Sequence, residues 1–338
     1  MPFLGMFSND IAIDLGTANT LIYMKGKGIV LNEPSIVTYD VTTRKIVAYG
    51  EEAKKMMGKV HKELNTIRPM RDGVIADFEI AEGMLKEFIK KITSGFMPAK
   101  RIVICVPSGI TEVEKRAVRD TAEKAGAKEV FLISEPMAAA IGIGLDVTAP
   151  FGNMIIDIGG GTTEIAVIAL SGITNGVSIR VAGDELTEAI IRFFRANQNI
   201  LIGETTAENI KCQVGSVMPL EEEIIIEVKG RDLVAGVPKL TEVSSIEIRE
   251  ALNAPVQQMI EAVKVALEKT APELSSDILD RGIFLTGGGA LLQGLDERIR
   301  VETGVPVHVA EEPLTAVARG TGKVLEDINK YRKVLLSR

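Results

Sequence analysis

Residues 11–20 read IAIDLGTANT, and residues 155–164 read IIDIGGGTTE. Each stretch places an aspartate, Asp14 or Asp157, inside an apolar strand that leads into a glycine-containing turn and a further apolar run. Short apolar runs bounded by glycine are typical of buried β-strands. Both stretches therefore predict a hairpin with an aspartate beside its turn, and the repetition indicates two related halves.

Two further paired features follow in the same order along the chain. Residues 101–109 and 282–287 each read as a buried strand that ends at a breaker, and Glu135-Pro136 and Glu312-Pro313 each read as a helix start. Helical apolar spacing is found in five segments: 80–92, 112–125, 184–196, 256–269 and 291–302. Hairpins followed by helices, twice over, predict an α/β protein whose halves meet around a cleft.

The composition excludes several classes of protein. The net charge is −7 and there is no tryptophan, so nucleic acid is not an expected partner. The two cysteines and two histidines are isolated in the sequence, which disfavours a zinc site or a disulfide framework and favours a reducing cytoplasm. No apolar run reaches the ~18 residues of a membrane span, and the N-terminus lacks the features of a signal peptide.

The sequence contains neither of two common nucleotide-binding motifs. The stretch from Gly320 to Lys323 resembles the end of a P-loop, but Val317 and Val324 stand where that motif needs glycine and a hydroxyl. No G-x-G-x-x-G opens a helix after a strand, which disfavours a dinucleotide site. The two glycine turns remain as the candidate anion site, because turns without bulky side chains let backbone N–H groups approach phosphate oxygens.

The expected phosphate donors come from both turns: Thr17, Ala18 and Asn19, and Gly160, Gly161 and Thr162. Asp14 and Asp157 would then flank a Mg²⁺ ion that keeps most of its waters. An ordinary hairpin explains either turn alone, whereas two such turns with an aspartate each favour the phosphate site. A third glycine cluster, residues 287–290, indicates either contact with a ribose or base, or tight packing of a strand on a helix.

The pattern resembles the actin/Hsp70/sugar-kinase ATPase superfamily, and over essentially the whole chain it is similar to the MreB family of bacterial actins, the rod-shape-determining proteins. The stretches that carry the resemblance are 9–23, 31–35, 134–142, 157–164 and 285–292. It implies an actin-like ATPase fold, with two ribonuclease H-like α/β halves around a nucleotide cleft and a smaller subdomain on each. The implied subdomains are IA (1–32, 66–145 and 315–338), IB (33–65), IIA (146–181 and 246–314) and IIB (182–245).

The resemblance also assigns roles to residues. Glu135 is implied to orient or activate the attacking water, with Thr162 opposite; a plain role for Glu135 as a carboxylate at a helix start stays open. Residues 203–211 resemble a helix that contacts adenosine, with Glu208 toward the ribose and Lys211 toward the base. The implied nucleotide-binding residues are Asp14, Gly16, Thr17, Ala18, Asn19, Asp157, Gly159, Gly160, Gly161, Thr162, Ala207, Glu208, Asn209, Ile210, Lys211, Gly287, Gly288, Gly289 and Ala290.

The implied function is an ATP-binding, ATP-hydrolysing bacterial actin. Such a protein assembles head to tail into filaments, with paired protofilaments, and works with membrane proteins of the wall-elongation machinery to set rod cell shape. Its expected cofactors are ATP and Mg²⁺, and its expected location is the cytoplasm, on the inner face of the plasma membrane. A small-molecule kinase of the same superfamily is the alternative; an Hsp70-like chaperone is disfavoured because no peptide-binding domain follows the two halves.

Two apolar segments predict contact with lipid. Phe3, Leu4 and Phe7 precede the first strand, and Phe96 and Met97 follow the helix expected at 80–92. The N-terminal segment lacks Lys and Arg, so attraction to anionic lipid should be small. Packing of Phe3, Phe7 and Phe96 on the protein itself is the alternative. The basic stretch 54–62 is expected to be a solvated face, and residues 68–73 a solvated loop or a subunit contact.

Overall fold

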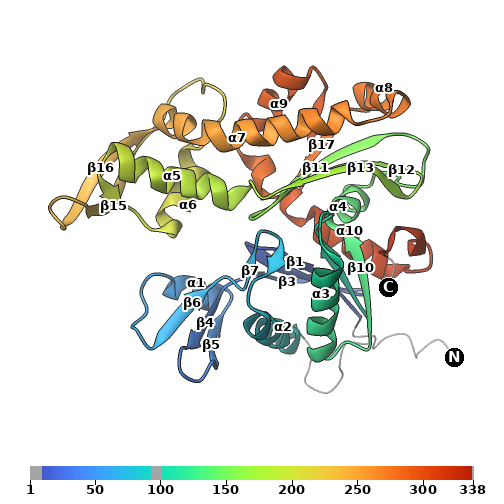
Figure 1. Ribbon diagram of the computed structural model, residues 1–338, viewed down its shortest axis with the longest axis horizontal. Helices are drawn as coiled ribbons and strands as arrows, with labels where there is room; N and C mark the ends of the chain where they lie inside the picture. Colours follow the sequence, from blue (N-terminus) through green and yellow to red (C-terminus); the bar gives the residue numbers. More distant parts are fainter. Residues whose placement is uncertain (1–9, 93–100, 337–338) are drawn as a thin grey trace.

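The computed structural model describes residues 10–92 and 101–336, and shows two sheet-and-helix halves (Figure 1). Phe3, Leu4, Phe7, Phe96 and Met97, the residues predicted to contact lipid, lie outside the described residues. Within the described part of the chain, no helix has the length and apolar character needed to cross a membrane.

Each half is built on a five-stranded sheet of the same topology, which confirms the internal repeat. The first sheet has the order β10-β9-β1-β2-β3 and the second β13-β12-β11-β17-β18, so β1 corresponds to β11 and β9 to β17. In the first sheet, β1, β2 and β3 form an antiparallel meander, and β9 and β10 run parallel to β1. In the second sheet, β11, β12 and β13 form the same meander, and β17 and β18 run parallel to β11. The strands are β1 (Ile11–Leu15), β2 (Asn19–Met24), β3 (Gly28–Pro34), β9 (Arg101–Val106) and β10 (Glu129–Ser134), then β11 (Asn153–Ile158), β12 (Thr163–Ala169), β13 (Gly172–Ile179), β17 (Ile283–Thr286) and β18 (Val307–Val309).

A smaller unit extends from each half. In the first half it holds α1 (Glu51–Met56), the three-stranded sheet β4 (Val37–Asp40), β5 (Ile46–Tyr49) and β6 (Leu64–Ile67), and then the short hairpin of β7 (Met70–Arg71) and β8 (Val74–Ile75). In the second half it holds α6 (Glu204–Val214) and the sheet of β14 (Ile200–Leu201), β15 (Ile225–Asp232) and β16 (Pro238–Ser244). Figure 1 shows both units on the side of the molecule away from α4 and α10.

Three of the five predicted helices lie close to the expected places: α2 (Phe78–Ile92), α3 (Glu112–Lys124) and α5 (Gly183–Asn197). The predicted start at 256 is wrong, since α7 (Ser245–Glu268) begins at a capping box of Ser244 and Glu247 and continues through Pro255. The predicted start at 291 is also wrong. Residues 288–291 form a 3₁₀ turn, and left-handed Gly294 separates it from α9 (Leu295–Thr303).

The two halves share a core around a close crossing of two helices. α4 (Glu135–Gly142) and α10 (Ala316–Glu326) pack between the two large sheets, and one apolar cluster takes residues from both sheets and both helices. A Cβ on Gly320 would lie 1.7 Å from the carbonyl oxygen of Ala138, and one on Gly142 would lie 1.9 Å from that of Ala316. Glycine at both positions therefore allows the backbones to touch. Glu312-Pro313 does not start α10 directly, because a 3₁₀ turn (Pro313–Thr315) intervenes.

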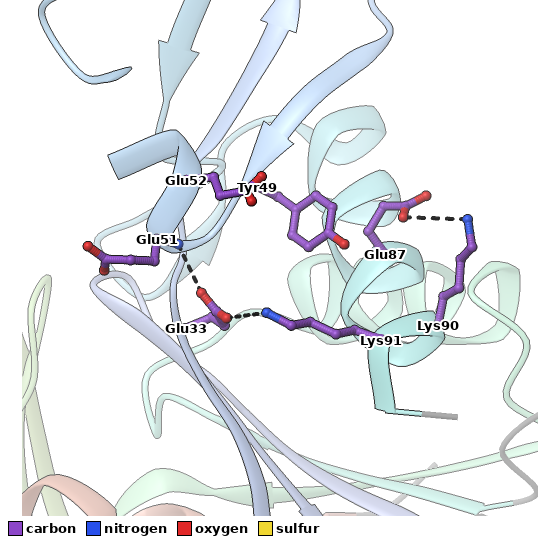
Figure 2. Close-up of a pocket in the computed structure, with 7 residues that line it drawn as sticks. All are labelled: Glu33, Tyr49, Glu51, Glu52, Glu87, Lys90 and Lys91. Carbon is purple, nitrogen blue, oxygen red and sulfur yellow. Dashed lines mark hydrogen bonds and ion pairs between the residues drawn. The ribbon is translucent and has the colours of Figure 1, made fainter. Parts of the chain in front are cut away.

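The small unit of the first half is fastened by Glu33, which Figure 2 shows in a surface pocket with Tyr49 and Lys91. The Glu33 carboxylate accepts hydrogen bonds from the Glu51 N–H at 2.9 Å and from Lys91 Nζ at 2.5 Å, and so ties the start of α1 to α2. The residues that line this pocket include none of those predicted for nucleotide binding or catalysis.

The remaining helical segments complete the surface of the second half and the end of the chain: α8 (Pro272–Arg281) and the 3₁₀ turn Arg332–Val334.

Candidate functional site

The two glycine turns are built alike. The Gly16 N–H donates to the Asn19 carbonyl at 3.1 Å, and the Gly159 N–H donates to the Thr162 carbonyl at 2.9 Å. Each bond closes a hairpin of antiparallel strands, with Asp14 opposite Leu21 and Asp157 opposite Glu164. The prediction of two hairpins, rather than strand-to-helix turns, is confirmed.

The turns face one another across the boundary between the halves. A Cβ on Gly160 would lie 2.8 Å from the Cβ of Ala18, and one on Gly161 would lie 2.7 Å from Thr17 Oγ1. The same Thr17 hydroxyl accepts a hydrogen bond from the Gly73 N–H at 3.1 Å. Glycine at 160 and 161 thus lets the two turns meet, and any side chain there would push them apart.

Above the turns lies a cavity of about 550 Å³, within the size range of small-molecule sites. Residues from both halves line it. The predicted residues on its wall are Asp14, Gly16, Thr17, Ala18, Asn19, Glu135, Asp157, Gly159, Gly160, Gly161, Thr162, Glu208, Lys211, Gly287, Gly288 and Gly289. The fold therefore brings together three glycine-rich segments that are far apart in the sequence.

Four predicted residues do not line this cavity. Ala207 and Ile210 are buried in the core of the second half, Ala290 is buried beside them, and Asn209 is exposed. The geometry of α6 explains three of them, because residues three or four apart share one face of a helix. Glu208, Lys211, Cys212 and Gly215 form the face that lines the cavity, so residues 207–211 do not line it as a continuous run.

Asp14 and Asp157 are a pair of carboxylates held in place by neutral donors. The Cys105 thiol donates to Asp14 Oδ1 at 3.3 Å, and the Thr286 hydroxyl donates to Asp157 Oδ1 at 3.0 Å. Burial raises the pKa of Asp14 to about 6, and burial together with the charge of Asp14 raises the pKa of Asp157 to about 7. A site with these properties favours a cation that would offset the charge of both groups.

The described residues contain no group of three or more His, Cys, Asp or Glu side chains able to hold a metal ion by themselves. Two carboxylates beside a cavity of this size nevertheless fit Mg²⁺, which takes one or two carboxylates and keeps several waters or phosphate oxygens as its other ligands. Asp14 and Asp157 would hold the ion.

Glu135 is the first residue of α4 and lines the cavity. A helix N-terminus alone would favour the ionised form. Instead, burial and then the charges of Glu164, Asp157 and Asp14 raise the pKa of Glu135 well above its usual range. A buried carboxyl group with a strongly raised pKa beside a cavity is a candidate for acid–base chemistry.

Glu208 and Lys211 line the cavity from α6 and are hydrogen-bonded to α5. Lys211 Nζ donates to Glu208 Oε2 at 2.6 Å, to the Gly183 carbonyl at 2.9 Å and to the Thr187 hydroxyl at 3.0 Å. The Thr187 hydroxyl also lies 2.6 Å from Glu208 Oε2. These contacts hold Glu208 in a fixed place on the wall, and they give Lys211 a role in positioning it.

Of the two alternatives expected for the third glycine segment, the structure shows the tight packing. A Cβ on Gly287, at φ 78°, would lie 2.3 Å from the Ile158 carbonyl oxygen, and one on Gly289 would lie 2.2 Å from Ile158 Cγ2. Both glycines are therefore required for close packing on the end of β11. All three, Gly287, Gly288 and Gly289, also line the cavity.

The sequence did not reveal several residues of the cavity wall. Lys54, expected on a solvated face, and Arg68, in a loop left undecided, both line it, as do Gly183, Asp184 and Gln293. Arg68 forms an ion pair with Glu204 of the other half at 2.7 Å. No local pattern marks these positions, because each reaches the cavity only through the packing of segments that are far apart in the sequence.

Comparison with known proteins agrees with this geometry. Residues 8–333 match the model of the family described as MreB/Mbl protein. The chain is 55% identical to the cell shape-determining protein MreB of Escherichia coli strain K12, over 99% of this chain and 98% of the relative. It is 50% identical to the cell shape-determining protein Mbl of Bacillus subtilis strain 168, over 98% and 100% of the two chains.

Solved structures show the same fold. MreB5 of Spiroplasma citri superimposes with TM-scores of 0.90 in its ADP-bound form and 0.91 in its AMPPNP-bound form, at 38% identity; the ADP-bound form covers 96% of both chains. A MamK double helical filament superimposes with a TM-score of 0.79 over 94% of this chain and 99% of that one, and at 23% identity it supports the fold alone. The predicted actin-like fold is confirmed.

Proposed function

The chain belongs to the MreB/Mbl family, and from this premise we propose that it binds ATP with Mg²⁺ between its two halves, hydrolyses ATP, and assembles into filaments. These filaments would lie on the inner face of the plasma membrane and organise cell-wall elongation with membrane proteins. We assign the four subdomains with the boundaries expected from the sequence, which place the cavity where IA, IB, IIA and IIB meet.

The observation that carries the proposal is the pair of equivalent hairpin turns that face each other below the cavity, each beside a buried aspartate. Backbone N–H groups of residues 17–19 and 160–162 are the donors proposed for the phosphates. Gly287–Gly289, Glu208 and the α6 face would hold the nucleoside. When bound, Mg²⁺ neutralises phosphate charge; Asp14 and Asp157 supply its protein carboxylates.

For hydrolysis, Glu135 is the proposed general base. Its raised pKa means that the ionised carboxylate takes a proton from water more readily than an ordinary glutamate would. Thr162, in the glycine turn of the second half, lines the same cavity and would orient the same water. The water oxygen would attack the terminal phosphorus of ATP while its proton moves to a Glu135 carboxylate oxygen. The bond from that phosphorus to the ADP oxygen breaks, and ADP and inorganic phosphate are the products.

The relatives support this function over a kinase. The two MreB5 structures are titled as bound to ADP and AMPPNP, and the MamK structure as a filament. The curated relatives are named as cell shape-determining proteins. A kinase would also need a base facing a second substrate, and Glu135 faces the same cavity as the proposed phosphate donors.

Phosphate release and light scattering after addition of Mg-ATP test the proposal. The parent should release phosphate and scatter light, and Glu135→Ala should scatter light while releasing phosphate ~10²–10⁴-fold more slowly. Glu135→Gln is the matched control, since it keeps the size of the side chain but not its basicity. A parent that neither releases phosphate nor assembles would overturn the proposal.

Membrane contact is proposed for Phe3, Leu4, Phe7, Phe96 and Met97. Burial of a few such side chains contributes ~1.5–3 kcal/mol each before ordering costs, which is a weak anchor for one subunit. Repetition along a filament would strengthen it. Liposome sedimentation should therefore pellet the polymerised parent and leave a Phe3/Phe7/Phe96/Met97→Ser variant in the supernatant, provided both assemble; equal pelleting would contradict the proposal.

A further inference from the structure

Glu164 is a buried carboxylate on the boundary between the two halves. It is the second residue of β12, opposite Asp157 in the hairpin register, and its exposed fraction is 0%. It does not line the cavity. Burial of a carboxylate is unfavourable unless hydrogen-bond donors surround it, so its partners decide what the side chain does.

Three donors meet this carboxylate. The Ser108 N–H donates to Glu164 Oε2 at 3.0 Å, and the Ser108 hydroxyl donates to the same oxygen. The Ser178 hydroxyl donates to Oε1 at 2.5 Å. Ser178 lies on β13, in the same sheet as Glu164, whereas Ser108 follows β9 of the first half. Two of the three bonds therefore cross between the halves.

This crossing lies next to Glu135 and Thr162. β9 and β10 run parallel with Val106 opposite Ser134, so Ser108 and Glu135 both follow the carboxyl ends of neighbouring strands. In the second half, Thr162 precedes Glu164 by two residues. A Cβ on Gly73 would lie 2.6 Å from Pro107 Cγ and 3.1 Å from Thr162 Cγ2, so only a glycine backbone separates Pro107 from Thr162.

Stability alone is a poor explanation for a carboxylate at this place. Glu164 adds a fourth acidic group to Asp14, Asp157 and Glu135, and its charge contributes to the raised pKa of Glu135. Like charges gathered in a buried site oppose folding. A neutral pair of side chains would join the halves at a lower electrostatic cost.

We propose that Glu164 is a positioning residue, which clasps Ser108 across the boundary and so fixes the separation of Glu135 and Thr162. The clasp controls the rate of ATP hydrolysis and not the affinity for ATP. This inference rests on the proposed ATPase function. Neither Glu164 nor Ser108 lines the cavity, so the effect passes through the two residues that they hold in place.

Glu164→Ala and Glu164→Gln test the clasp, with kcat and KM measured at the pH optimum of each variant. Glu164→Ala removes all three bonds, and a misplacement near 1 Å can reduce a rate ~10²-fold, so kcat should fall at least ~10-fold while KM for Mg-ATP changes less than ~3-fold. Glu164→Gln can accept from Ser108 through its carbonyl oxygen and donate to the Ser178 oxygen. It should restore kcat to within ~3-fold of the parent.

The two serines form a matched pair that decides the question even where Glu164→Ala does not fold. Ser108→Ala removes a bond between the halves and should lower kcat ~3-fold or more, because a displacement smaller than that of Glu164→Ala remains. Ser178→Ala removes a bond within one half, at an exposed residue where water can take the place of the hydroxyl, so kcat should not change.

Equal kcat in Ser108→Ala and Ser178→Ala, an unchanged kcat in Glu164→Ala, or a loss of ATP binding in that folded variant would each overturn the role of Glu164. A parent that shows no phosphate release with Mg-ATP would instead overturn the proposed ATPase function. The two failures are therefore distinguishable.

Discussion

The guanidinium of Arg68 donates two hydrogen bonds, of 2.7 and 3.0 Å, to a single carboxylate oxygen of Glu204. Arg68 follows β6 in the first half, and Glu204 begins α6 in the second. Arg68 lines the cavity, and α6 lies on the side of the molecule away from α4 and α10 (Figure 1). The halves are thus joined on one side by packed helices and on the other by a partly exposed ion pair, which is the easier of the two to open.

We expect Arg68→Ala to speed the release of bound nucleotide. Partly exposed ion pairs contribute ~0.2–1 kcal/mol, so the dissociation rate should rise about 2- to 5-fold. Stopped-flow displacement of a fluorescent ATP analogue measures this rate. Arg71→Ala, an exposed arginine three residues further on, is the matched control and should behave like the parent. The double variant Arg68→Glu/Glu204→Arg exchanges the two charges and should restore slow release. If release stays fast, the Arg68–Glu204 ion pair does not hold the two halves together around the nucleotide.

The pKa of Asp157 predicts how the stability of the nucleotide-free protein depends on pH. The folded protein holds a proton on Asp157 up to about pH 7, whereas an unfolded aspartate loses it near pH 4. Between these values the folded state binds more protons, so the free energy of unfolding falls as the pH rises. Asp157→Asn has no proton to lose and should therefore be more stable than the parent at pH 8, by about 1–4 kcal/mol.

Calorimetric melting in EDTA at pH 5, 6, 7 and 8 checks this expectation. The melting temperature of Asp157→Asn should exceed that of the parent by a few degrees at pH 8, and the difference should shrink toward pH 5. The same variant should bind Mg-ATP more weakly. A difference that does not vary with pH, or a less stable variant at pH 8, would show that the charge of Asp157 is not a destabilising group.

The crossing of α4 and α10 should tolerate no side chain. In Gly320→Ala the new Cβ would meet the carbonyl oxygen of Ala138, a backbone atom that cannot turn aside. Overpacking of this kind typically costs ~1–3 kcal/mol, and denaturant unfolding measures it. Gly203→Ala at the start of α6 is the control, because a Cβ there meets nothing within 4 Å. Equal unfolding free energies for the two variants would contradict the close crossing.

The hairpins and the repeat could be predicted from the sequence because their signals are local. Apolar runs of strand length, an aspartate and a glycine turn appear within ten residues, so both halves are visible before any folding is considered. Helix starts were less predictable. The capping box at Ser244 lies twelve residues before the expected start at 256, and α7 continues through Pro255.

Contacts across the boundary could not be predicted, because they join residues far apart in the chain. Ser108 and Glu164 are 56 residues apart, and Arg68 and Glu204 are 136 residues apart. Nothing in the sequence next to these residues indicates which partner each side chain meets. The face of α6 is an intermediate case, since helical periodicity would have separated Glu208 and Lys211 from Ala207 and Ile210.

Binding of Mg-ATP to a variant with a blocked turn tests the central claim most directly. Titration calorimetry would compare the parent, Gly160→Val and Gly172→Val, at concentrations below those at which filaments form. A Cβ at 160 would lie 2.8 Å from the Cβ of Ala18 in the facing turn, whereas a Cβ at 172 has the Ala169 carbonyl oxygen, at 3.8 Å, as its nearest contact outside the adjacent residues. The account predicts one ATP per chain for the parent and Gly172→Val, and at least ~10-fold weaker binding for Gly160→Val with its circular dichroism unchanged. Equal affinity in all three folded proteins would contradict a nucleotide site between the two turns.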